Sequence, residues 1–463
     1  MSMPSISSRF FSASGPFWVF VQHGAGRIAL ALKFLVLARV LGPEGVGLIG
    51  VGLLAMAIAE ALSELGLMQA LVQRREALTQ AQLSAVWGWQ LLRAALLGTG
   101  LALLAWPAAQ FFSLPEAFPI FTLVAVLLVL RGSVNLSLTL ALRDMQMRRV
   151  GLFNASFVVT DAVLGILIAL LTQSVLAVFI AMVATEGTRW FLSYKAFAPP
   201  PRPSLSHEAS EFAEFGKWIW MNNILNFMLN QTDKFMVAKI VGISGLGTYQ
   251  MAQRLAQLGV ADIGIVLSQY LFPKLSQQMR SDHQRAVELT LALFALMAAG
   301  GMAAVLTLNA LAEPLLAILL GESWRVAAPT FRILVGGMYG GLLTAVLAPF
   351  LKAEGKAWIV SGAALAQLLA LCTLLFLLRE NGMTGVAVAS STAVWVAVFF
   401  ILTGALAYIE TVWQTLRAQW GLWLILAWCP LLTLWSPELW HVGSVIALGL
   451  FSARLSTLLR QLR

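Results

Sequence analysis

The sequence predicts an all-α polytopic membrane protein with about fourteen transmembrane helices, and three observations support this fold class. Hydrophobic residues make up 59% of the 463 residues and charged residues only 11%, whereas a soluble domain carries about 25% charged residues. Apolar segments of about 20 residues, each long enough to cross a bilayer, follow one another along the chain. The loops between them are alternately rich and poor in Lys and Arg. Spans of this length must be helical, because unpaired backbone cannot lie in hydrocarbon.

The spans divide into two sets of six, followed by two more. The first six are predicted at 17–38, 46–71, 85–106, 118–142, 150–171 and 174–194, and the next six at 216–238, 246–272, 287–308, 328–351, 357–378 and 385–408. The last two are predicted at 418–435 and 438–456.

The segments outside the spans define the predicted domains. Residues 1–15 are Ser-rich and lack the apolar core of a signal peptide, so they are expected to be a cytoplasmic N-terminal segment. Residues 198–214 are Pro-rich and polar, which favours a cytoplasmic linker. This linker would join an N-lobe (16–197) to a C-lobe (215–408). Residues 409–463 would hold the last two helices and a cytoplasmic tail.

The basic residues predict the orientation of the chain in the membrane. Seventeen of them fall in one set of alternate loops, and only Arg39, Lys239, Arg325 and Arg379 fall in the other. The positive-inside rule then places both termini in the cytoplasm. Because orientation explains the net charge of +9, no nucleic-acid partner is predicted. The two cysteines, Cys372 and Cys429, show no spacing motif, so neither a disulfide, a metal site nor a cofactor is expected.

The two sets of six spans carry an internal repeat. Residues 38–42 (Ala-Arg-Val-Leu-Gly) return as 238–242 (Ala-Lys-Ile-Val-Gly), and the glycines of 45–47 return in 245–247 at the same offset of 200. Six helices separate the copies, so both have the same orientation, and a parallel pseudo-twofold axis along the membrane normal is expected. Two such six-helix bundles predict a transporter that works by alternating access.

Residues 230–242 (Asn-Gln-Thr-Asp-Lys-Phe-Met-Val-Ala-Lys-Ile-Val-Gly) and 245–249 (Gly-Leu-Gly-Thr-Tyr) carry a family resemblance. With the segments 37–45, 271–275 and 321–325, they resemble the polysaccharide-transport, or O-antigen flippase (Wzx-type), family. This family belongs to the multidrug/oligosaccharidyl-lipid/polysaccharide (MOP) exporter superfamily, and the resemblance covers nearly the whole chain.

The resemblance implies a V-shaped pair of six-helix lobes with two extra C-terminal helices. It also implies that the chain moves a polyprenyl-diphosphate-linked oligosaccharide, an O-antigen or exopolysaccharide repeat unit, from the cytoplasmic to the periplasmic face of the bacterial inner membrane. No catalytic motif comes with it. The implied partners are the anionic lipid-linked substrate, membrane lipids, an H⁺ or Na⁺ coupling ion, and the glycan polymerase and export machinery.

Charged residues within the spans are the candidate site, because a charge at mid-bilayer costs about 2.5–3.5 kcal/mol and usually faces a cavity or a partner. The candidate substrate-binding residues of a cationic cleft are His23, Arg27, Lys33, Arg93, Arg131 and Arg254. Guanidinium groups suit a diphosphate, since their planar fork can bond two oxygens. The candidates for ion coupling or for structural ion pairs are Glu60, Glu64, Asp161, Asp233 and Asp262.

The structural alternative pairs these charges with one another. Arg27 would then pair with Glu60 or Glu64, and Arg131 with Asp161, while Lys33 would extend to the membrane surface. Glu60 and Glu64 lie four residues apart on one helix face, which would suit a proton or sodium relay unless arginines neutralise them. For Asp233 and Lys234 the alternative is a charge pair that anchors the outer end of the seventh span.

Two other functions compete with lipid-linked oligosaccharide transport. A cation-coupled drug or metabolite antiporter of the same superfamily should concentrate acids in its cleft, whereas the first lobe offers at least as many arginines as acids. An integral-membrane glycan polymerase or ligase should carry a large outer loop with catalytic groups. The longest outer loop here, about 309–327, is short, so the chain is not expected to be an enzyme.

Overall fold

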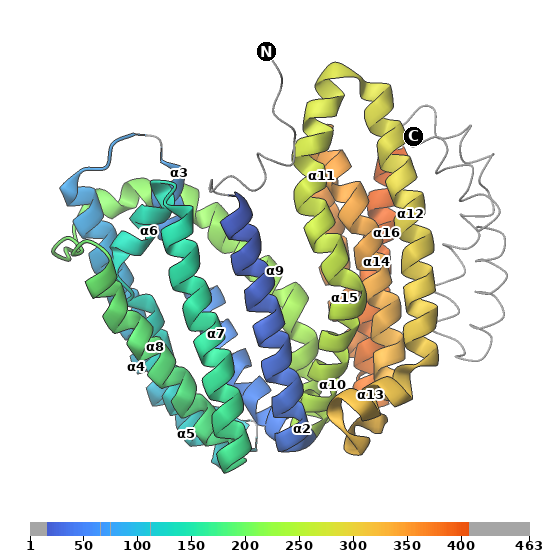
Figure 1. Ribbon diagram of the computed structural model, residues 1–463, viewed down its shortest axis with the longest axis horizontal. Helices are drawn as coiled ribbons and strands as arrows, with labels where there is room; N and C mark the ends of the chain where they lie inside the picture. Colours follow the sequence, from blue (N-terminus) through green and yellow to red (C-terminus); the bar gives the residue numbers. More distant parts are fainter. Residues whose placement is uncertain (1–15, 65, 75, 112, 407–463) are drawn as a thin grey trace. The chain divides into compact units, whose positions relative to one another are not determined.

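The computed structural model describes residues 16–406 apart from 65, 75 and 112, and describes their side chains except those of 16–25, 213–215 and 406. All regular structure in this part of the chain is helical (Figure 1), which confirms the all-α prediction. The chain divides into two compact units: unit 1 extends to Gln231 and unit 2 begins at Thr232. Helix α9 (Ser210–Ile240) belongs to both. The predicted segment 1–15 and the last two predicted spans lie outside the described residues.

Unit 1 is a bundle in which α5 and α7 make the main connections. Helix α2 packs against α7 and α5, α4 packs against α5, and α8 packs against both α5 and α7 (Figure 1). Its elements before α9 are α2 (Pro16–Ser63), α3 (Leu67–Gln73), α4 (Gln80–Phe111), η1 (Pro115–Ala117), α5 (Phe118–Gly132), α6 (Leu136–Arg143), α7 (Met147–Thr172), α8 (Val175–Ala196) and η2 (His207–Ala209).

A glycine divides the long helix α2 between the first two predicted spans. Gly42 has φ 67° and ψ −176°, a backbone conformation that is in practice restricted to glycine. Gly242, at the equivalent position of the sequence repeat, has φ 89° and ψ −170° and separates α9 from α10. The repeat positions therefore share one backbone conformation, which supports the repeat at these two turns; the repeat as a whole stays a prediction.

The fourth predicted span, 118–142, is wrong as a continuous helix, because the chain breaks between α5 and α6. Asn135, which is 1% exposed, satisfies the freed backbone groups. Its side-chain oxygen accepts from the Ser137 N–H at 2.9 Å, and its amide donates to the carbonyl oxygens of Ser193 (3.1 Å) and Ala198 (2.9 Å). Irregular backbone within a predicted span is tolerated only when the protein satisfies its polar groups in this way. The second span, 46–71, is also broken, since α2 ends at Ser63 and α3 begins at Leu67.

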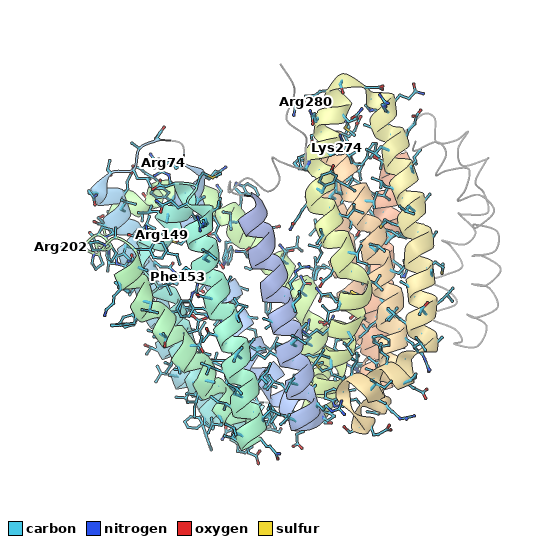
Figure 2. All side chains as sticks on the ribbon, in the orientation of Figure 1. Arg74, Arg149, Phe153, Arg202, Lys274 and Arg280 are labelled. Carbon is cyan, nitrogen blue, oxygen red and sulfur yellow. The ribbon has the colours of Figure 1, made fainter. Side chains whose placement is uncertain are left out.

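One end of unit 1 carries an apolar core and many basic side chains. Leu71, Trp87 and Phe212 pack together there from α3, α4 and α9. Arg74 and Arg149 lie toward this end (Figure 2). The Arg74 guanidinium donates to Glu211 at 2.8 Å and thereby ties the C-terminal end of α3 to the start of α9. The loop before α9 lies along α4, where the Ser204 N–H donates to the carbonyl oxygen of Ser84 at 2.9 Å.

Unit 2 is built around α14, which packs against α10, α11, α12, α15 and α16. Phe331, Leu343 and Phe350 of this helix are fully buried. After α9 its elements are α10 (Ile243–Ala256), the π-helical turn η3 (Gln257–Ala261), α11 (Asp262–Ser281), α12 (His283–Ala310), α13 (Ala312–Leu320), η4 (Glu322–Ala327), α14 (Ala328–Ala353), α15 (Ala357–Leu377), η5 (Arg379–Asn381) and α16 (Gly382–Leu406).

Ten helices of the described chain are long and apolar enough to cross a membrane. Helix α2 counts once among the ten although Gly42 divides it, and the more polar α9 is not included. Large apolar side chains are exposed on these helices, among them Leu103 (76%), Leu171 (83%) and Phe376 (65%). Such surface suits contact with lipid rather than with water. The chain is thus a multi-pass membrane protein, while the total of fourteen helices stays a prediction.

Candidate substrate site

The charges within the helices of unit 1 gather into one cluster. Helix α2 contributes Glu60, and Glu64 follows its end; α4 contributes Arg93, α5 contributes Arg131, and α8 contributes Glu186 and Arg189. We call these six residues the unit 1 charge cluster. It holds three arginines and three carboxylates, so arginines and acids are equal in number in this set.

Arg131 lies near the C-terminal end of α5 and contacts two acids from two other helices. Its Nε donates to Glu186 Oε1 at 3.1 Å, and its Nη1 lies 3.6 Å from Glu60 Oε1. The same Nη1 donates to the sulfur of Met56 at 3.4 Å. The break after Gly132 ends α5 directly beyond this arginine, so its side chain reaches α8 from a helix end.

Glu186 holds a second arginine on its other oxygen. Arg189, three residues further along α8, places Nη1 at 3.2 Å from Glu186 Oε2. Its Nη2 donates to Asn154 Oδ1 of α7 at 3.4 Å. The Glu186 side chain is 15% exposed, against 26% for Arg189 and 33% for Arg131. The carboxylate is therefore the most enclosed member of this group.

Arg93 joins the cluster from α4 through neutral partners. Its Nε donates to the hydroxyl of Ser63 at 3.2 Å and its Nη1 to Gln90 Oε1 at 3.4 Å. The carboxylates of Glu64 and Glu60 attract it electrostatically. Glu64 also accepts a hydrogen bond of 2.6 Å from the Gln69 side chain of α3. The two glutamates predicted as a relay thus lie near arginines, and the choice between a relay and neutralisation stays a prediction.

Lys33 and Asp161 form a separate pair between α2 and α7. Lys33 Nζ donates to Asp161 Oδ2 at 2.7 Å, and the lysine side chain is only 4% exposed. Gly165, one turn beyond Asp161, leaves room for the lysine, because a Cβ there would lie 2.7 Å from Lys33 Cε. The predicted pairing of Arg131 with Asp161 is wrong, since each has a different partner. The alternative in which Lys33 extends to the membrane surface is also wrong.

The other N-terminal candidates lie on the first part of α2. Arg27 is exposed on this helix, and the side chain of His23 lies outside the described residues. Their part in a substrate site therefore stays a prediction.

In unit 2, Asp233 is the centre of a buried polar network. The side chain is 4% exposed, and its Oδ2 accepts from the Tyr249 hydroxyl at 2.8 Å and from Gln253 Nε2 at 3.0 Å. Tyr249 also bonds Ser390 of α16 at 3.1 Å. Lys234 Nζ lies 3.7 Å from Asp233 Oδ1. Asp233 thus joins α9 to α10 and, through Tyr249, to α16. The alternative expected from the sequence was a charge pair with Lys234 alone; the structure adds these contacts between helices.

Arg254 and Asp262 flank the π-helical turn of unit 2 and attract each other electrostatically. The predicted span 246–272 therefore contains an irregular turn between its two charged residues. Such π-turns occur frequently at functional sites. Among the residues that the structure describes, no three His, Cys, Asp or Glu side chains gather as a metal site would require.

The sequence analysis missed Glu186 and Arg189, the residues that complete the unit 1 charge cluster. Both lie within the predicted span 174–194, so a charged pair three residues apart in an apolar segment was the available signal. It also missed Gln253 and Ser390, which are neutral and give no such signal. Their roles depend on contacts between helices that are distant in the sequence.

The sequence profile of a known family, described as polysaccharide biosynthesis protein, matches residues 36–329, more than half of the chain. The chain belongs to this family. The match confirms the resemblance carried by residues 230–249.

Two curated relatives illustrate the family. One is the succinoglycan biosynthesis transport protein ExoT of Rhizobium meliloti, 26% identical over 337 residues, which cover 70% of this chain and 66% of the relative. Another is the lipopolysaccharide biosynthesis protein WzxC of Escherichia coli, 20% identical over 68% of this chain and 66% of that protein. The alignment therefore spans slightly less than two thirds of each relative's length.

The polytopic transporter fold is shown by two solved structures. A lipid II flippase MurJ in an inward closed conformation has a TM-score of 0.66 at 13% identity, covering 94% of this chain and 97% of that chain. An inward-facing multidrug resistance MATE family transporter of the MOP superfamily has a TM-score of 0.61 at 13% identity, covering 84% and 98%. At these identities the likeness shows the fold alone.

Proposed function

We propose that this protein moves a lipid-linked oligosaccharide from the cytoplasmic to the periplasmic face of a bacterial inner membrane. The family match carries the proposal, because relatives in this family are named for succinoglycan transport and lipopolysaccharide biosynthesis. The fold, which is similar to that of a multidrug resistance MATE family transporter of the MOP superfamily, supports it. On this proposal the chain is a transporter rather than an enzyme, and both termini lie in the cytoplasm.

The unit 1 charge cluster supplies the chemistry that such a substrate requires. A polyprenyl diphosphate carries its negative charge where the lipid meets the glycan, and arginine binds phosphate oxygens with charge-assisted hydrogen bonds. Arg93 and Arg131 bring guanidinium groups from two helices into unit 1. These side chains are partly exposed and lie on membrane-spanning helices. Charged groups within such helices face protein or water rather than lipid. We assign the headgroup to this cluster, with Arg27 as a further contact.

Glu60 and Glu64 are the candidates in unit 1 for coupling transport to H⁺ or Na⁺. The glycan polymerase and export machinery are the expected protein partners, because they would use the transported repeat unit.

The test is to locate lipid-linked glycan on each face of the inner membrane in a deletion strain. We expect glycan to accumulate on the cytoplasmic face, and the wild-type gene to relieve this. Arg27→Ala and Arg131→Gln should fail to relieve it at normal protein levels in the membrane. Arg325→Gln, which breaks an exposed pair with Glu322, is the matched control and should restore export.

The same strain separates the competing function. Normal glycan on both faces, together with loss of export of a small organic cation, would favour an antiporter. Glu60, Glu64 and Asp262 would then become the first candidates for the substrate site.

A further inference from the structure

Glu186 is bound on both of its oxygens by guanidinium groups that come from two helices. Arg131 of α5 holds Oε1 at 3.1 Å, and Arg189 of α8 holds Oε2 at 3.2 Å. Glu186 lies ten residues before the end of α8, about 15 Å along the helix axis. The Glu186 carboxylate therefore lies well inside the span. It sits between two arginines whose guanidinium groups could bind a phosphate in its place.

The remaining contacts of the two arginines are long. Arg131 Nη1 lies 3.6 Å from Glu60 and 3.4 Å from the Met56 sulfur, and Arg189 Nη2 lies 3.4 Å from Asn154. The two contacts with oxygen are longer than the about 2.7–2.9 Å that is usual for a charge-assisted hydrogen bond, and the thioether sulfur of Met56 is a weak acceptor. Both guanidinium groups are also partly exposed. Hence Arg131 keeps donor capacity that an entering anion could use.

The position of Arg189 on the same helix as Glu186 distinguishes it from Arg131. Residues three apart on a helix are neighbours whatever the surrounding helices do, so Arg189 can stay with Glu186 when α5 and α8 adjust. Arg131 reaches Glu186 across a helix contact and can leave it. A carboxylate without a partner inside a span would be costly, and Arg189 removes that cost.

We propose that Glu186 is an internal competitor of the substrate phosphate for Arg131. In the free protein its carboxylate occupies Arg131; an entering diphosphate takes Arg131, and Arg189 retains the released Glu186. The inference rests on the proposed function for the identity of the anion. It assigns Arg131 as the phosphate ligand, Glu186 as the competing anion and Arg189 as a positioning residue that acts through Glu186.

The test measures binding of inorganic pyrophosphate to the purified full-length protein in detergent by calorimetry at constant ionic strength. Glu186→Gln should lower the Kd by roughly tenfold, because the competing charge is removed. Arg131→Gln should abolish binding. Arg189→Gln should raise the Kd, since Glu186 then stays on Arg131, and the double variant Glu186→Gln/Arg189→Gln should return to the Kd of Glu186→Gln. A double-mutant cycle isolates this coupling.

Unchanged or weaker pyrophosphate binding by folded Glu186→Gln would overturn the proposal and leave Glu186 as a structural ion pair. Binding by Arg131→Gln as tight as by the wild type would overturn it as well. If Glu186→Gln does not fold, Glu186→Asp replaces it: the shorter side chain withdraws from Arg131 but keeps its charge, so binding should tighten by a smaller factor. Arg325→Gln is the control and should bind pyrophosphate like the wild type.

Failure of this inference is distinguishable from failure of the proposed function. Normal glycan distribution in the deletion strain, together with tighter pyrophosphate binding by Glu186→Gln, would reject oligosaccharide transport and keep the anion site. Cytoplasmic accumulation of glycan, together with unchanged binding by Glu186→Gln, would reject only the competition.

Discussion

Single charged residues within the spans have partners on other helices, and these partners decide what each charge can do. Lys33 is enclosed with Asp161, whereas Arg131 divides its donors between Glu186 and Glu60 and stays one third exposed. Because an enclosed ammonium has no surface to offer, Lys33 is better placed to hold α2 against α7 than to bind a ligand. Arg131 has both the exposure and the exchangeable partners that ligand binding needs.

Breaking the Lys33–Asp161 pair should destabilise unit 1. Lys33→Met leaves the Asp161 carboxylate without its ammonium partner, and removing one member of a buried pair costs about 3–5 kcal/mol. The double variant Lys33→Met/Asp161→Leu should recover most of this loss, because no charge remains unpaired. Unfolding of the purified proteins by denaturant measures both. A single variant as stable as the wild type would show that the pair contributes little.

The contact between Arg74 and Glu211 should make stability depend on pH. The hydrogen bond from Arg74 holds the pKa of Glu211 below its ordinary value of 4.5. A carboxyl group whose pKa is lower in the folded state stabilises the fold above its ordinary pKa, and this contribution is lost as the pH falls through the folded-state value. Glu211→Gln should therefore lower the Tm slightly at neutral pH, and the difference from the wild type should shrink as the pH falls below 4.5 and vanish once it is below the folded-state pKa. A difference that persists in acid would contradict this.

At the scale of elements, short breaks in the helices place the functional side chains. Asn135 closes the break between α5 and α6 with hydrogen bonds to Ser137, Ser193 and Ala198. This break ends α5 just after Arg131 and holds its last turn beside α8. An unbroken helix over 118–142 would lack the hydrogen bonds by which Asn135 connects the end of α5 to α8.

The two turn glycines should be equally intolerant of a side chain. Gly42→Ala and Gly242→Ala should each cost about 1–3 kcal/mol, although a Cβ would meet nothing within 4 Å, because the backbone conformation itself excludes it. The two costs should add, since the positions lie in different units. Gly300→Ala is the matched control: its Cβ also meets nothing within 4 Å, but its backbone is helical, so stability should be unchanged or slightly higher. Denaturation compares the wild type, the three single variants and the double variant Gly42→Ala/Gly242→Ala; equal stability of all five proteins would contradict the argument.

For the whole molecule, the distribution of basic loops predicts one orientation in both units. Arg202 in unit 1 and Arg280 in unit 2 should face the cytoplasm, and Glu322 the periplasm. In a background without Cys372 and Cys429, Arg202→Cys and Arg280→Cys should resist a membrane-impermeant maleimide in intact spheroplasts, whereas Glu322→Cys should react. Labelling at only one of the two arginine positions would contradict the parallel repeat.

Much of the fold was predictable from the sequence because hydrocarbon imposes a strong local rule on the chain. Twenty apolar residues in succession must form a helix, and the repeated Gly42 and Gly242 both fall between predicted spans. The broken spans were not predictable in the same way. The chain 118–142 is apolar enough to continue as one helix, and the break is explained by the fit of Asn135 against α8 and the segment after it, together with its local bond from Ser137.

Composition and spacing thus determined that this chain is a multi-pass helical membrane protein and which charges lie within its spans, and the resemblance of residues 230–249 indicated its family. Only the tertiary structure decided their partners: Lys33 with Asp161, Arg131 with Glu186, and Asp233 with Tyr249. The physical reason is the distance along the chain over which each property is determined. Burial of a helix depends on its own residues, whereas an ion pair depends on the rotation and depth of two helices that can lie more than a hundred residues apart in the chain.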